Sequence, residues 1–400
     1  MGTTFSQEST GLDTARMSKT AAYYLAFVAL GLTSATLGPT LPDLAENTRT
    51  HLREISFLFT ARSLGYLIGS FFGGRLYDSK AGHPVMAVML LGMALALILI
   101  PTLSLLWLLT AVLLLLGVVE GALDVGGNTL LVWVHRHLVG SYMNGLHFFF
   151  GIGAFLTPLI VAQTVLLSGD ITWAYWALAL LVAPVALWLL RLPSPAAQKV
   201  AKGGPAGQVN HRLVALIVVF FFLYVGAEVA FGGWIFTYAV ELNVASEAVA
   251  AYLTSGFWGA LTIGRLLAIP IAARVRPRYM LLADLIGCVV SVGLVLLWPG
   301  SLGVVWLGTL GVGLSMASIF PTTISLAERR MTVTGQVTGW FFVGASAGGM
   351  VLPWLIGQFF EGVGPQVVMM VLWVDLVLAL GVLLVLISHS TRAVIKVEES

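Results

Sequence analysis

Three polar side chains recur at intervals of four residues inside a stretch that is otherwise mostly apolar. Glu120, Asp124 and Asn128 would stack on one face of a helix, because positions i, i+4 and i+8 are neighbours there. Two carboxylates one turn apart repel each other in a low dielectric, so one of them can hold a proton at neutral pH. Carboxylate and amide oxygens are also the ligands that hard cations such as sodium prefer. The pattern predicts an ion-coupling site at Glu120 and Asp124, for either a proton or sodium, with Asn128 able to complete a sodium site.

Arg62 offers a structural alternative for these two acids, because an ion pair with either one would simply hold two helices together. An ionisable side chain inside a bilayer is costly and marks a functional site by default. A purely structural pair seldom needs both acids, so the sequence favours the coupling interpretation.

Further polar and aromatic residues fall at a similar depth and can contact a solute. Asn128 and His147 lie nearly equally far from the turn between their helices, where an amide and an imidazole can hydrogen-bond a polyol; His147 could instead bond a backbone carbonyl. Glu228 lies near the middle of its apolar segment, and the rings of Trp234 and Trp340 can stack on the apolar face of a sugar. We expect all five residues to bind substrate.

The elements that must position these residues are long apolar segments. The chain is 58% hydrophobic and 10% charged, with a mean hydropathy of +0.97, which excludes an ordinary soluble domain. Twelve segments are long enough to cross a bilayer as helices. They are residues 21–43, 54–78, 84–102, 104–134, 141–167, 172–192, 212–240, 247–272, 279–298, 303–327, 335–359 and 366–388. The fold class is therefore an all-α membrane protein with twelve transmembrane helices.

The basic residues predict how the chain is oriented. If the first segment starts in the cytoplasm, all of the 20 Lys and Arg residues except Arg49, Arg53 and Arg62 fall on the cytoplasmic side. The positive-inside rule then places both termini in the cytoplasm. We expect an integral protein of the cell (inner) membrane, in contact with the lipid bilayer.

A long polar break over residues 193–211 divides the chain into two halves. It predicts a cytoplasmic linker between six-helix bundles at 21–192 and 212–388, with cytoplasmic tails at 1–20 and 389–400. Residues recur between the halves at an offset of 194 or 195 positions, which predicts two parallel pseudo-repeats. The matching pairs are Gly31 and Gly226, Gly38 and Gly233, Gly65 and Gly259, Gly117 and Gly311, Thr129 and Thr323, and Arg136 and Arg330.

With these repeats, the full chain resembles the major facilitator superfamily, whose members rock one half against the other to alternate access. The run Gly73-Gly74-Arg75-Leu76-Tyr77-Asp78-Ser79-Lys80-Ala81-Gly82-His83 looks like the family signature between helices two and three, with one extra residue before Gly82. The resemblance implies a cytoplasmic gating latch at Arg75 and Asp78. Arg265 and Asp284 lie close to the cytoplasmic ends of spans eight and nine, and we expect them to form the second-half counterpart of this latch rather than a substrate site. The resemblance also implies a central cavity lined by spans one, four, seven and ten, with spans two, five, eight and eleven along its sides.

Three stretches carry a narrower resemblance, to the fucose:proton symporter branch and within it the sodium-dependent glucose transporter group. They are residues 120–129, residues 144–154 with Pro158, and residues 226–234. The resemblance implies an ion-coupled symporter, driven by a proton or sodium, of a sugar or a similar small polar solute.

Other functional classes find less support in the sequence. The chain has no nucleotide-binding loop of the Gly-x-x-x-x-Gly-Lys type, no metal-ligand spacing and no catalytic triad pattern. We therefore expect no cofactor, no enzymatic activity, no nucleic-acid partner and a monomer. A drug or lipid exporter on the same fold is the nearer alternative, and an intramembrane enzyme is the more distant one. The polar residues above favour a hydrophilic solute over both.

Overall fold

The computed structural model describes residues 2–136, 139–196, 210–331 and 333–398. All regular structure in these residues is helical, and most of the predicted linker 193–211 lies outside them. The helices, with the single-turn helix η1, are α1 Gly2–Ser34, α2 Leu37–Thr48, α3 Leu52–Ile55, α4 Phe57–Ser79, α5 Gly82–Leu99, η1 Ile100–Thr102, α6 Leu106–His135, α7 Val139–Ser168, α8 Ile171–Arg191, α9 His211–Glu241, α10 Glu247–Ala272, α11 Pro277–Leu297, α12 Leu302–Met316, α13 Ile319–Glu328, α14 Gly335–Val363 and α15 Val367–Glu398.

The twelve predicted spans follow these elements in chain order, with α1 and α2, α3 and α4, α5 and η1, and α12 and α13 each forming one span together. Eleven spans in the described chain are long and apolar enough to cross a membrane, and α1 with α2 supplies a twelfth that is bent by 44°. The bend follows from Pro39, the third residue of α2, whose ring would clash with the carbonyl of Ala35 one turn earlier in an unbroken helix. The prediction of twelve transmembrane helices is confirmed, with the first one broken.

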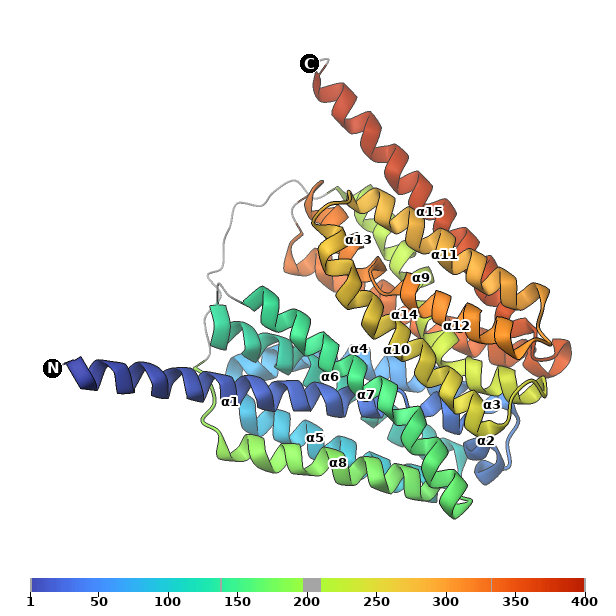
Figure 1. Ribbon diagram of the computed structural model, residues 1–400, viewed down its shortest axis with the longest axis horizontal. Helices are drawn as coiled ribbons and strands as arrows, with labels where there is room; N and C mark the ends of the chain where they lie inside the picture. The colour runs from blue at the N-terminus through green and yellow to red at the C-terminus, as the bar shows by residue number, and fades with distance from the viewer. Residues whose placement is uncertain (1, 137–138, 197–209, 332, 399–400) are drawn as a thin grey trace.

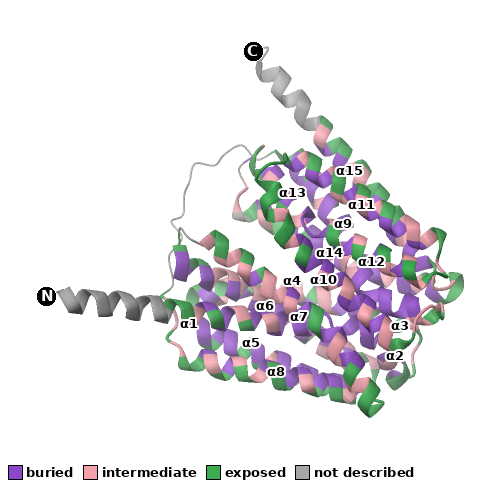
Figure 2. Ribbon diagram, in the orientation of Figure 1, coloured by how far each residue is buried: buried purple, intermediate pink, exposed green. Residues whose placement is uncertain are grey.

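The two halves splay apart toward the side of the chain ends and meet at the opposite side. In Figure 1, α5 and α8 form one outer edge of the molecule, α11 and α15 form the other, and α2 and α3 lie where the halves meet. Figure 2 shows buried residues along the faces that helices turn toward one another. Large apolar side chains such as Leu167, Leu180 and Trp107 are exposed on the outer faces, which suits a surface that lipid covers.

Glycines at helix crossings show the internal repeat. A Cβ added at Gly31 would collide with the backbone of α7, and one at its predicted counterpart Gly226 would lie 3.0 Å from the backbone of α14. At both crossings the absent side chain lets two backbones approach closely, as small residues do in membrane helix pairs. The first helix of each half thus packs against the fifth in the same way, and the predicted parallel pseudo-repeat is confirmed.

Two predicted pairs of counterparts are wrong. A Cβ at Gly65 would meet the backbone of α6 in the same half, whereas one at Gly259 would meet the Phe155 ring of α7 in the other half. A Cβ at Gly117 would meet the backbone of α4, whereas one at Gly311 would meet the side chain of Ser291 in α11. The structural counterpart of Gly117 is Gly313, which faces the backbone of α10. Residues two positions apart along a helix differ in direction by more than half a turn. Because glycine is common in this chain, a sequence offset can therefore pair two glycines that lie on different helix faces.

Asp375 in α15 is a buried acid with no partner. Its side chain is 4% exposed, and neither carboxylate oxygen has a hydrogen-bond partner among the described residues. A buried polar group without a partner costs free energy. We therefore expect Asp375→Leu to raise the melting temperature of the purified protein by on the order of a few degrees, in a thermal unfolding measurement. The same change at the exposed Asp78 is the control, and a clear loss of stability in Asp375→Leu would contradict this account.

Candidate functional site

A cavity of about 450 Å³ lies between the two halves, within the size range of small-molecule sites. Its wall comes from α1, α2, α4, α6 and α7 in the first half and from α9, α10, α13 and α14 in the second. The helices α1 with α2, α6, α9 and α13 belong to the predicted spans one, four, seven and ten. The helices α4, α7, α10 and α14 belong to spans two, five, eight and eleven. The predicted lining of the cavity is confirmed.

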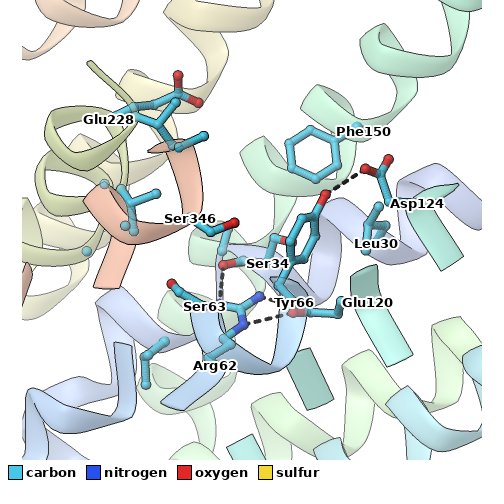
Figure 3. A pocket seen from close by; sticks show the side chains of 18 of the residues that line it. Leu30, Ser34, Arg62, Ser63, Tyr66, Glu120, Asp124, Phe150, Glu228 and Ser346 are labelled. Atoms are coloured by element: carbon cyan, nitrogen blue, oxygen red, sulfur yellow. Dashed lines mark hydrogen bonds and ion pairs between the residues drawn. The ribbon is translucent and has the colours of Figure 1, made fainter. Parts of the chain in front are cut away.

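Glu120 is held in a bidentate ion pair with Arg62. Arg62 donates from Nε to Glu120 at 2.9 Å and from Nη2 at 2.7 Å, and Glu120 is 1% exposed. The same guanidinium donates to the carbonyl oxygens of Ser34 at 2.9 Å and Thr33 at 3.3 Å, at the end of α1 where regular helical pairing stops. Figure 3 shows the pair beside Ser34. Arg62 thus ties α4 and α6 to the end of α1, which matches the structural alternative for Glu120.

Asp124 lines the same cavity but has only neutral partners. Tyr66 donates its hydroxyl to one carboxylate oxygen at 2.6 Å, and Asn128 donates from Nδ2 to the other at 3.0 Å. No ion pair involves Asp124 within the described chain. In the first half, Asp124 is therefore the cavity acid whose charge is not balanced by a neighbouring cation.

The three oxygen-bearing residues of the predicted sodium set do not converge. Both carboxylate oxygens of Glu120 accept hydrogen bonds from Arg62, and Asn128 turns its NH₂ group toward Asp124. The described residues contain no group of three or more His, Cys, Asp or Glu side chains arranged to hold a metal ion. A cation in the first half would depend on Asp124 more than on Glu120.

The second half contributes Glu228, Trp258 and Arg265 to the wall. Tyr224 donates its hydroxyl to Glu228 one turn away on α9, and Figure 3 shows Glu228 across the cavity from Glu120 and Asp124. The predicted gating pair of Arg265 and Asp284 is not formed. Arg265 lies in the cavity wall on α10, whereas Asp284 on α11 accepts a hydrogen bond from Ser318, because the two side chains leave their helices toward different neighbours.

Of the predicted substrate residues, Asn128, His147 and Glu228 reach the cavity and the two tryptophans do not. Trp234 is fully buried; its ring stacks on Phe360 with centroids 5.1 Å apart, and its indole N–H donates to the Pro353 carbonyl at 3.0 Å.

Trp340 is 54% exposed and is likewise absent from the wall. Of the aromatic residues that line the second half, which are Phe320, Phe342 and Trp258, Trp258 lies on α10 with Arg265 and touches α9 at Gly232, one turn after Glu228. Its sequence neighbourhood carries no polar pattern, so only the packing of α10 against α9 identifies it.

Polar contacts close the side of the cavity away from the chain ends. His51 Nδ1 lies 3.2 Å from Glu361 Oε1, and Arg53 and Gln358 exchange hydrogen bonds of 3.1 and 3.0 Å. Leu52 N–H also donates to Glu361 at 3.1 Å. These contacts join α3 and its flanking residues in the first half to α14 in the second.

Within the described chain, no comparable set of polar contacts joins the halves on the side of the chain ends. Arg75 and Asp78 are both exposed, and the Arg75 guanidinium lies over the Phe71 ring at 5.0 Å. Among the described residues neither one forms an ion pair. In the part of the chain that the structure describes, the latch that the sequence predicts is therefore not formed by an ion pair.

Comparisons with known proteins agree with this architecture. Residues 23–353 match the family model of the Major Facilitator Superfamily. The chain is 33% identical over 363 residues to sodium-dependent glucose transporter 1 of Xenopus laevis, covering 83% of this chain and 74% of that protein. It is 32% identical to sodium-dependent glucose transporter 1 of Homo sapiens, covering 83% and 71%.

The fold is also similar to a solved structure of the nucleoside transporter NupG. The TM-score is 0.76 at 14% sequence identity, covering 93% of this chain and 99% of that one. At this identity the likeness concerns the fold alone. Two six-helix halves around a polar cavity, the match over residues 23–353 and relatives of this similarity establish that the chain is an integral membrane protein of the Major Facilitator Superfamily.

Proposed function

We propose that this transporter is a symporter that uses a sodium gradient to move a sugar by alternating access. The observation that carries the proposal is Asp124, a cavity acid with two neutral donors and no balancing cation. The relatives named as sodium-dependent glucose transporters support both the ion and the solute class.

The coupling follows from the electrostatics of closing the cavity. While one side is open, water solvates the Asp124 carboxylate. Closing that side as well would bury the charge without a balancing cation, which is strongly unfavourable. A cation bound at Asp124 removes this penalty, so the halves can close over a loaded cavity. Glu120 needs no such cation because Arg62 already balances it.

A proton is the second candidate ion, and the geometry at Asp124 also suits it. Arg62 occupies both oxygens of Glu120, which leaves one carboxylate for the cation, and one carboxylate is sufficient for a proton. Sodium would need further oxygen ligands, which the solute or water can supply.

The orientation of the chain completes the proposal. The excess of Lys and Arg on the side of both chain ends places that side in the cytoplasm. The cavity described above then faces inward, and the contacts of His51 and Arg53 with α14 close the outer side. We place the protein in the cell membrane with both termini cytoplasmic.

Ligand-dependent stability of the purified protein tests this function. A ligand that binds only the folded state raises the melting temperature, so glucose and related sugars should stabilise the protein, and sodium should enlarge the effect. If the ion is a proton, acidic pH should replace sodium in the same experiment. Stabilisation by amphiphiles but by no sugar would favour a drug or lipid exporter instead.

A further inference from the structure

We propose that Glu228, Trp258 and Arg265 form the sugar subsite, and that it is separate from the cation site around Asp124. This assignment rests on the proposed symport function and divides it between the halves. The first half binds the ion, and the second half holds the sugar ring.

Arg265 is the donor group of this subsite. It lies partly exposed in the cavity wall, and within the described chain it makes no hydrogen bond or ion pair. A guanidinium presents several N–H donors in a rigid plane, which suits two neighbouring oxygens. Arg62, the other cavity arginine, already donates to Glu120 and to two backbone carbonyls. Arg265 is therefore the arginine whose donors are available to a solute with adjacent hydroxyl groups.

Glu228 is the acceptor group. One of its carboxylate oxygens accepts a hydrogen bond from the hydroxyl of Tyr224, and no donor among the described residues reaches the other. A carboxylate accepts hydrogen bonds from sugar hydroxyls, and these are stronger than bonds between neutral groups. Because Glu228 and Arg265 carry opposite charges, the subsite is balanced without an ionic solute. A neutral polyol suits it better than an acid or an amine.

Trp258 supplies the apolar surface. A Cβ added at Gly232 would lie 3.0 Å from Trp258 Cζ2, so the indole rests against the bare backbone of α9, and both residues line the cavity. An aromatic ring beside charged groups matches the two surfaces of a pyranose, which has an apolar C–H face and a polar rim. Gly232 thus leaves space for the indole of Trp258 at the cavity wall. Trp234 cannot supply an aromatic surface there, because its ring is buried against Phe360.

Calorimetric titration of the full-length protein in nanodiscs tests the assignment, with glucose and sodium as the probes. In Glu228→Gln and Arg265→Gln we expect glucose affinity to fall on the order of tenfold to a hundredfold, as for the loss of a charge-assisted hydrogen bond. Trp258→Leu should also weaken glucose binding. Arg274→Gln and Trp107→Leu, at exposed positions outside the cavity, are the matched controls.

Stabilisation by sodium distinguishes the outcomes. The three subsite variants should keep the wild-type rise in melting temperature with sodium, which also shows that they fold. Wild-type glucose affinity in Glu228→Gln and Arg265→Gln would overturn the subsite. Loss of the sodium response in those variants would overturn the separation of the two sites. If the wild-type protein binds no sugar at all, the proposed function fails instead, and the result is distinct from a failure of the subsite.

Discussion

Asp124→Asn is expected to abolish sodium-driven sugar accumulation in proteoliposomes while exchange of sugar across the membrane continues. The amide keeps the size of the side chain but carries no charge, so the cavity can close without a cation. Exchange requires no net movement of the ion, whereas accumulation does. Measuring both processes in one preparation therefore isolates the coupling role of Asp124 from solute binding.

Glu120→Gln serves as the contrasting variant. It would leave the Arg62 guanidinium buried without its carboxylate, which costs about 3–5 kcal/mol, so we expect less folded protein rather than an uncoupled carrier. The double variant with Arg62→Gln removes both charges and should recover part of the folded yield. Accumulation against a gradient by Asp124→Asn would refute the assignment and make Glu228 the leading alternative.

Cross-linking residues 51 and 361 is expected to stop transport almost completely. His51 and Glu361 approach to 3.2 Å across the closed side, and alternating access requires them to separate in every cycle. Cysteines at both positions, in a Cys288→Ser background, can be joined by a short reagent with a reducible bond. Uptake should cease after treatment and return after reduction.

The two single-cysteine proteins are the controls, because the reagent can modify but not join them. They should transport at the same rate before and after treatment. Undiminished uptake by the fully cross-linked double variant would show that this side does not open, and alternating access through this cavity would be wrong.

The arrangement of spans could be predicted because it depends on local properties. The length and apolar composition of each helix can be read from its own sequence. Helical periodicity alone predicts that Glu120, Asp124 and Asn128 share one face. The spans that line the cavity were implied by the family resemblance. Asn128, His147 and Glu228 were therefore expected at the site, and they line the cavity.

The rotation of each helix about its axis could not be predicted in the same way. Trp234 lies beside two cavity-lining glycines, yet its ring faces Phe360, since a neighbouring residue on a helix points about 100° away. Arg265 and Asp284 were paired because they have similar depth, but their helices direct them to different partners. Trp258 reaches the cavity because α10 packs against α9, and the sequence of one helix alone does not show such a contact.

The broken first span has a mechanical consequence. Arg62 holds the carbonyl oxygens of Thr33 and Ser34 where α1 ends, and α2 beyond the break packs on α9 at Gly38, where an added Cβ would lie 2.7 Å from the Gly232 carbonyl. The stiffness of this joint therefore depends on an ion pair inside the cavity wall. Weakening the pair would let α2 swing away from the second half and open the outer mouth while the inner one is still open. Under the proposed symport function, the fraction of such a carrier that still folds would conduct ions as a leak, and the intact Arg62–Glu120 pair would protect the gradient.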